Sequence, residues 1–123
     1  MIKKKVLVVD DTEPNRLLLG AILASCGLAV VYAEDTDDAF ETFASELPDM
    51  VIMDQILPGG LGSDTINRMK KLRSGFVSVI TSALTDPSDI QRIVASCGAD
   101  GFLPRPVSTD DIQRLLTEQK IIP

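Results

Sequence analysis

The sequence predicts an α/β fold in which a parallel sheet is covered by helices on both faces. Two observations lead to this prediction: short aliphatic runs recur along the chain, and the segments between them carry apolar residues at helical spacing. Regular alternation of strand and helix is typical of parallel sheets, because each helix returns the chain to the edge where the next strand begins. The chain has 123 residues, which suits one full-sized core, and we expect residues 1–123 to form a single domain.

Five aliphatic runs are predicted to be strands. Each run is short and is bounded by polar or turn-forming residues, which favours strands that are buried on both faces of the sheet. The predicted strands are residues 6–9, 29–33, 50–53, 76–80 and 101–103.

The segments between and after these strands are predicted to be helices. They cover residues 14–26, 37–47, 63–73, 88–97 and 108–118. Pro14 suits a first helical turn, while Gly27 and Gly98 suit helix ends. The second helix places four apolar residues on one face: Phe40, Phe43, Ala44 and Leu47. Because crossovers are right-handed, few arrangements remain, and for five units we predict a flavodoxin-like, doubly wound sheet with strand order 2-1-3-4-5.

Composition excludes several classes of function. The net charge of −6 argues against nucleic acid as a direct partner. Neither a transmembrane segment nor a signal peptide is predicted, because the apolar runs are too short, and we expect a cytoplasmic protein without a membrane partner. The absence of His excludes His-based metal sites and catalytic triads within this chain. Cys26 and Cys97 are expected to be buried, reduced thiols.

Polar residues follow four of the five predicted strands. Asp10 and Asp11 follow the first strand, Asp54 the third, Thr81 the fourth and Arg105 the fifth. Taken singly, each reads equally well as a turn, a cap or a surface charge. Since the carboxyl ends of parallel strands share one edge, together they predict a site. Three carboxylates that meet there need a cation, and oxygen ligands favour Mg²⁺.

Four ordered stretches resemble the receiver domain of bacterial response regulators: VLVVDD, VIMDQILPGGLG, ITSA and GADGFLPRPVS. The resemblance spans nearly the whole chain. It implies that Asp10, Asp11 and Asp54 bind Mg²⁺ together with the backbone carbonyl of Ile56. It also implies that Asp54 accepts a phosphoryl group from a sensor histidine kinase or a phosphotransfer protein.

The same resemblance assigns a switch. Thr81 would turn to bond the phosphoryl group, and Phe102 would turn inward as the aromatic switch residue. The fourth helix, fifth strand and fifth helix, roughly residues 88–118, would then bind a downstream protein target, with dimerisation on activation left open. The bond between Arg105 and Pro106 is expected to be cis, because it often is at this place in the family.

Arg105 departs from the family pattern, which nearly always has Lys at this position. Arg keeps the charge but is larger, planar and able to bind bidentately, so the exchange is not conservative at a crowded site. It favours an alternative, a pseudo-receiver that binds partners without being phosphorylated.

Two further alternatives fit less well. A phosphatase of the haloacid dehalogenase type needs an acid two residues after the nucleophile, where this chain has Ile56. A nucleotide binder needs a phosphate loop after the first strand, where this chain has the acidic stretch DDTEPN.

Overall fold

The sheet predicted from the sequence is present in the computed structural model, which describes residues 3–123. Five parallel strands lie in the order β2-β1-β3-β6-β7, which confirms the predicted order 2-1-3-4-5. Their bounds are β1 (Lys5–Val9), β2 (Ala29–Ala33), β3 (Met50–Asp54), β6 (Val77–Ser82) and β7 (Gly101–Pro104).

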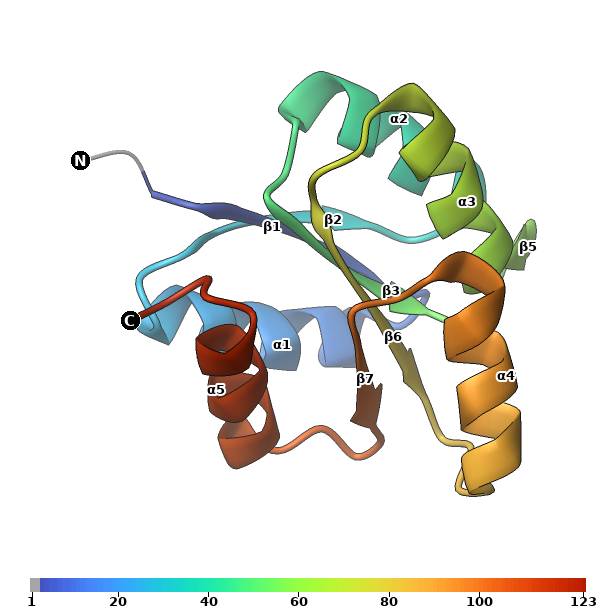
Figure 1. The fold of residues 1–123 in the computed structure, drawn as a ribbon. Helices are drawn as coiled ribbons and strands as arrows, with labels where there is room; N and C mark the ends of the chain where they lie inside the picture. Colours follow the sequence, from blue (N-terminus) through green and yellow to red (C-terminus); the bar gives the residue numbers. More distant parts are fainter. Residues whose placement is uncertain (1–2) are drawn as a thin grey trace.

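Five helices cover the sheet, with α1 and α5 on one face and α2, α3 and α4 on the other (Figure 1). Their bounds are α1 (Glu13–Ser25), α2 (Thr36–Glu46), α3 (Gly62–Leu72), α4 (Pro87–Cys97) and α5 (Thr109–Glu118). Each predicted helix is present, with bounds that differ by about one residue. Three helices begin with a side-chain cap, from Asp35, Asp86 and Ser108.

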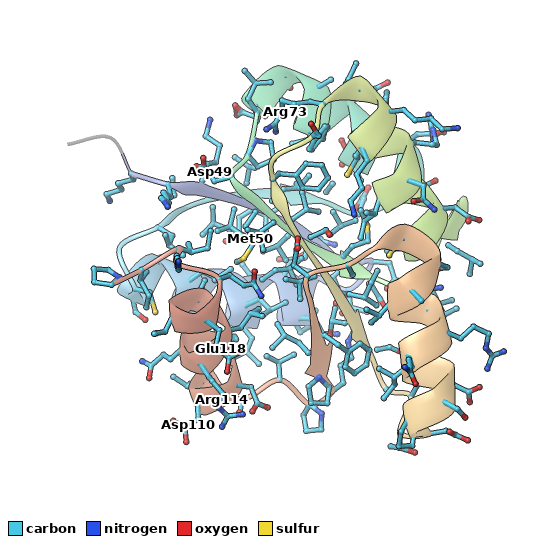
Figure 2. All side chains as sticks on the ribbon, in the orientation of Figure 1. Asp49, Met50, Arg73, Asp110, Arg114 and Glu118 are labelled. Atoms are coloured by element: carbon cyan, nitrogen blue, oxygen red, sulfur yellow. The ribbon has the colours of Figure 1, made fainter. Side chains whose placement is uncertain are left out.

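Two apolar cores fill the spaces between sheet and helices. Successive residues of a strand point to opposite faces, so Val6 and Val8 contact the α1 and α5 side, while Leu7 and Val9 contact the other side. The core residue Met50 is fully buried, while Asp110 lies on α5 at the surface (Figure 2). The inner strands β1, β3 and β6 separate the two cores and are the most completely buried strands.

The expectation that every strand is buried on both faces is wrong for the edges of the sheet. All five residues of β3 are buried, whereas most residues of the edge strands β2 and β7 are only partly buried. Tyr32 on β2 is 42% exposed. An edge strand has a neighbouring strand on one side alone, so its side chains stay closer to water.

The predicted apolar face of α2 is also only partly correct. Phe43 is fully buried, but Leu47 is 60% exposed. The helix ends at Glu46, and Leu47 adopts a left-handed conformation with φ of 50°, which turns its side chain away from the helical face. From α2, Ala39 and Phe43 lie in the core and the predicted Phe40 packs against it, whereas the predicted Ala44 is exposed.

One small element was not predicted. After β3 the chain forms a two-stranded antiparallel ribbon, β4 (Ile56–Leu57) with β5 (Gly60–Leu61), before α3 begins. Gly59 has φ of 94°, in a region that favours glycine, and allows the tight turn between them. This ribbon fixes the path of the loop that follows Asp54.

Of the two cysteines, Cys97 is buried as predicted, but Cys26 is only partly buried; both are free thiols. Burial raises the pKa of the Cys97 thiol. Within residues 3–123, no helix has the length and apolar character needed to cross a membrane.

Candidate functional site

Three carboxylates meet where the strands of the sheet end. Asp10 directly follows β1 and Asp54 is the last residue of β3, so the parallel register of these strands brings them side by side. Asp10 is fully buried, Asp54 is 6% exposed and Asp11 lies at the surface. One carboxylate oxygen of each residue lies within 4.8 Å of the others. The structure thus brings together the three acids that the sequence singled out.

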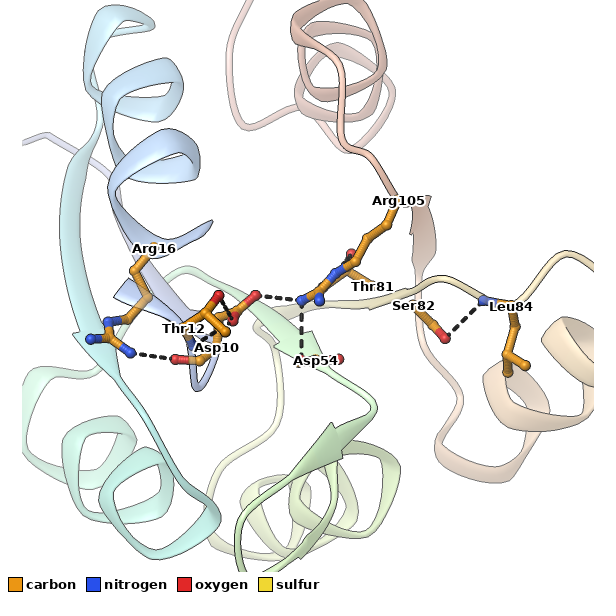
Figure 3. A network of polar contacts seen from close by, with 8 residues as sticks. All are labelled: Asp10, Thr12, Arg16, Asp54, Thr81, Ser82, Leu84 and Arg105. Atoms are coloured by element: carbon orange, nitrogen blue, oxygen red, sulfur yellow. Dashed lines mark hydrogen bonds and ion pairs between the residues drawn. The ribbon is translucent and has the colours of Figure 1, made fainter. Parts of the chain in front are cut away.

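The Asp10 carboxylate is held by the turn that leads into α1. Its Oδ1 accepts hydrogen bonds from the backbone N–H of Thr12 at 2.9 Å and from the Thr12 hydroxyl at 3.0 Å. Arg16 donates through Nη1 to the backbone carbonyl of Asp10 at 2.7 Å (Figure 3). Neither residue was identified from the sequence, although an acid two residues before Thr is a known local turn pattern.

The segment after Asp54 is fixed by two close contacts. A Cβ on Gly62 would lie 2.1 Å from the backbone oxygen of Asp54, so only glycine fits there. The buried Gln55 side chain donates to the Ser63 hydroxyl at 3.0 Å and accepts from the Ser63 backbone N–H at 2.9 Å. Gln55 was missed because a single amide in an otherwise aliphatic stretch gives no sequence signal of its partner.

Arg105 lies between the acids. Its Nη2 forms ion pairs with Asp10 and with Asp54, the latter at 3.1 Å, and its Nε donates a long hydrogen bond of 3.4 Å to the Thr81 hydroxyl (Figure 3). The Arg105 side chain is 25% exposed and Thr81 is buried. The Arg105–Pro106 bond is cis, as predicted. One guanidinium thus joins the carboxyl ends of β1, β3, β6 and β7.

Burial raises the pKa of Asp54 above its usual value, and this effect outweighs the opposing influence of Arg105. The neighbouring Asp10 carboxylate raises the pKa further. A carboxyl group in these surroundings loses its proton more readily when a cation is close. Positive charge close to Asp54 therefore favours the ionised form of its carboxyl group.

The donor set fits a hard divalent cation. All three side chains offer carboxylate oxygens, and two of them are buried close together, where their repulsion calls for a counter-ion. Ile56 is also near, because it lines the same hollow as Asp54 and Arg105, with its side chain 68% exposed. The arrangement suits Mg²⁺ bound at the edge of the protein, where water completes its coordination.

Phe102 lies apart from this cluster. It is partly buried on β7, packs against the core on the α2, α3 and α4 side, and lines a small hollow with residues of α5, among them Arg114. Phe102 lies on β7, and Arg105 directly follows the end of that strand. It brings Asp10, Asp11, Asp54, Thr81 and Arg105 into one site but leaves Phe102 at the neighbouring edge of the sheet.

Solved structures share this fold. The chain matches a response regulator receiver domain protein (CheY-like) from Methanospirillum hungatei JF-1 with a TM-score of 0.87 and 22% identity, covering 96% of this chain and 94% of that one. It matches the chemotaxis protein CheY4 from Vibrio cholerae with a TM-score of 0.85 and 24% identity, covering 98% and 100%. At these identities the likeness shows the fold alone.

Curated relatives are longer than this chain. The phosphate regulon transcriptional regulatory protein PhoB of Escherichia coli is 30% identical over 111 residues, which are 89% of this chain and 48% of that protein. A cyclic di-GMP phosphodiesterase of Thermotoga maritima is 30% identical over 112 residues, 91% of this chain and 30% of that protein. The chain spans less than half the length of these relatives. The family model of the response regulator receiver domain matches residues 6–117, and the chain belongs to this family, the receiver domain of two-component signalling.

Proposed function

We propose that this receiver domain accepts a phosphoryl group on Asp54 from a sensor histidine kinase or a phosphotransfer protein, in a reaction that depends on Mg²⁺. The observation that supports this most is the convergence of three carboxylates, the Thr81 hydroxyl and the Arg105 guanidinium at one end of the sheet. Receiver domains bind Mg²⁺ at an acidic pocket and interact with histidine kinases and downstream targets. The names of the curated relatives describe whole proteins, of which this chain matches less than half.

In the proposed reaction an Asp54 carboxylate oxygen attacks the phosphorus of a phosphohistidine. A new oxygen–phosphorus bond forms, the nitrogen–phosphorus bond breaks, and the histidine nitrogen leaves with the electron pair. The product is an acyl phosphate on Asp54, and no oxidant or reductant is needed. Asp54 suits this role because it lies at a strand end with one face toward the hollow that Ile56 and Ala83 line.

Asp10, Asp11 and Asp54 would hold the cation, together with the backbone carbonyl of Ile56. When bound, Mg²⁺ supplies positive charge against the transferred phosphoryl oxygens. Thr81 would then donate its hydroxyl hydrogen bond to one phosphoryl oxygen, and Arg105 would pair with another. These roles fit the positions of both side chains at the ends of β6 and β7.

The signal would leave through α4, β7 and α5, with Phe102 as the residue that changes its packing. The number of buried residues in each helix supports the choice of the face that contains α4. In α3 five residues are buried, whereas in α4 only Cys97 is fully buried. A helix with few buried contacts moves at low cost, so α4 is the element best suited to respond to events at Thr81.

A second candidate function is a pseudo-receiver that binds its partner without phosphorylation. The observation that favours it is Arg105 itself, because its guanidinium contacts both Asp10 and Asp54 and thereby occupies the acidic cluster. In that case the protein keeps the receiver fold for its surface alone.

Intact-mass measurement after incubation with Mg²⁺ and a small phosphodonor separates the two functions. We expect the parent protein to gain one phosphoryl group and the Asp54→Asn variant to gain none. Asp64→Asn is the matched control, because Asp64 is an exposed acid at the start of α3 outside the cluster, and it should behave as the parent does. No gain in the parent with several donors would overturn the proposal and favour the pseudo-receiver.

A further inference from the structure

One nitrogen atom of Arg105 occupies a position that bears on how a divalent cation would bind the three carboxylates. Nη2 contacts Oδ2 of Asp10 and also Oδ2 of Asp54, so a single donor atom lies between the two buried carboxylates. A divalent cation held by Asp10 and Asp54 would need these same carboxylate oxygens. Guanidinium and metal therefore cannot both make these contacts at once.

We propose that Arg105 is an internal counter-ion that competes with the divalent cation, so that cation binding and displacement of the guanidinium are a single event. This inference rests on the proposed function, because it assumes that the cluster binds a divalent cation. It concerns the arginine of this chain, whose planar fork reaches two carboxylates and a hydroxyl together, which a single ammonium group does less well.

The electrostatics explain why the metal-free protein needs such a counter-ion. Asp10 and Asp54 are both buried, and two adjacent carboxylates without a cation repel each other and lose their hydration. Arg105 compensates part of this charge in the absence of metal. Three carboxylates against one guanidinium still leave an excess of negative charge, which attracts a divalent ion from solution.

Room for the displaced side chain exists on both sides of Arg105. One hollow of about 370 Å³ is lined by Arg105 with Asn15, Leu18 and Val107, and a second of about 500 Å³ is lined by Arg105 with Ser82 and Leu84. Because Arg105 lines both hollows, its side chain has space to turn away from the acids on either side.

Displacement would also act on the switch hydroxyl. The same guanidinium donates from Nε to the Thr81 hydroxyl, so a metal that moves Arg105 away from the acids also ends this hydrogen bond. Thr81 is buried and loses its contact with Arg105 at that moment. Cation binding would thus prepare Thr81 for the phosphoryl group before any phosphorylation takes place.

Calorimetric titration of the metal-free protein with Mg²⁺ tests the competition. We expect Arg105→Met to bind Mg²⁺ about tenfold more tightly than the parent, a difference of about 1.4 kcal/mol. Arg105→Lys keeps the charge on one nitrogen and should lie between the two. Arg16→Met is the matched control, since Arg16 carries the same charge and contacts only the backbone carbonyl of Asp10, and its affinity should stay within about twofold of the parent.

The Nε–H resonance of Arg105 in an NMR spectrum gives a second measurement on the unaltered protein. We expect this resonance, assigned by its loss in Arg105→Lys, to shift when Mg²⁺ saturates the site, while that of Arg16 stays in place. An unchanged Arg105 resonance at saturation would overturn the proposal even if Arg105→Met failed to fold.

The outcomes also separate this inference from the proposed function. Equal affinities in the parent and Arg105→Met, or an equal gain in Arg16→Met, overturn the competition and leave phosphorylation of Asp54 standing. Tighter binding in Arg105→Met without phosphoryl uptake in the parent supports the competition and overturns the proposed function. If no variant binds Mg²⁺, both the competition and the metal dependence are wrong.

Discussion

The two ends of the central sheet use aspartate in opposite ways. At the amino end, Asp49 precedes β3 and accepts a hydrogen bond from the Lys5 backbone N–H at 2.8 Å, while Asp100 precedes β7 and accepts one from the Ser78 backbone N–H at 2.9 Å. At the carboxyl end, Asp10 and Asp54 face each other and share the single guanidinium of Arg105. Figure 2 shows Asp49 beside Met50, where the chain enters β3.

An acid at the end of a strand stabilises the fold when it accepts a hydrogen bond from a backbone N–H of the neighbouring strand in the sheet. Each acid at the amino end has such a neutral donor, so it carries its charge without needing an ion. The acids at the carboxyl end share one guanidinium, and this shortage of positive charge makes the cluster suited to a divalent cation. Residue type is the same at both ends, but Asp49 and Asp100 are exposed to water, whereas Asp10 and Asp54 are buried beside each other.

The largest expected effect is on the rate of phosphoryl uptake, which should fall when an acid at the carboxyl end of the sheet is replaced but not when one at the amino end is. Asp10→Asn should slow phosphoryl uptake about 100-fold, because it removes one of the three carboxylates that would hold Mg²⁺, while its amide oxygen can still accept the Thr12 hydrogen bonds. Asp49→Asn is the counterpart at the amino end and should leave the rate unchanged. Time-resolved intact-mass measurement with a small phosphodonor gives both rates. Similar rates in the two variants would contradict the difference between the two ends of the sheet.

The second expected effect is on stability, which should fall when an acid at the amino end of the sheet is replaced. Asp100→Ala should lower the free energy of unfolding by about 1–3 kcal/mol, because the backbone N–H of the buried Ser78 loses its charged partner. Urea denaturation measures this loss. The Mg²⁺ affinity of the same variant should match that of the parent, and a weaker affinity would show that the two ends are coupled.

The smallest effect concerns Asp86, an acid in the loop after β6 that caps α4. Hydrogen bonds from the Ser88 hydroxyl and backbone N–H hold the pKa of Asp86 below its usual value of 3.8. A lowered folded-state pKa gives stability that is present above pH 3.8 and is lost as pH falls through the folded-state pKa. Asp86 thus behaves like the amino-end acids, although its loop follows the carboxyl end of a strand.

Asp86→Asn keeps the cap acceptor and removes the charge. We expect it to be slightly less stable than the parent at neutral pH, with the difference shrinking as pH falls below 3.8. Urea denaturation across this pH range measures the difference. A difference that stays constant with pH would show that the charge of Asp86 contributes nothing.

Much of the fold follows from local patterns. The aliphatic runs at residues 50–53 and 6–9 predicted two strands that are almost fully buried, because a run without alternation suits a strand covered on both faces. The same reasoning overestimated the burial of β2, since a sequence does not say which strands lie at an edge. It also missed the ribbon of β4 and β5, whose two-residue strands are too short to give a pattern.

The candidate site also has a part that was predictable from the sequence and a part that was not. Asp10, Asp54 and Thr81 were identifiable because position at a strand end is read directly from the chain, and in a parallel sheet such ends share one edge. The contacts of Gln55 with Ser63 and of Thr12 with Asp10 came only from the structure. Each depends on how a loop folds back, which composition does not specify.

The sequence by itself determined the alternation of strands and helices, the charge-bearing residues at the strand ends and the departure of Arg105 from the family pattern. Only the tertiary structure decided that the Arg105 guanidinium lies between Asp10, 95 residues earlier, and Asp54. The physical reason is range: periodicity and turn preferences act over a few neighbouring residues, whereas the sharing of one cation by distant carboxylates depends on strand order and register across the whole sheet.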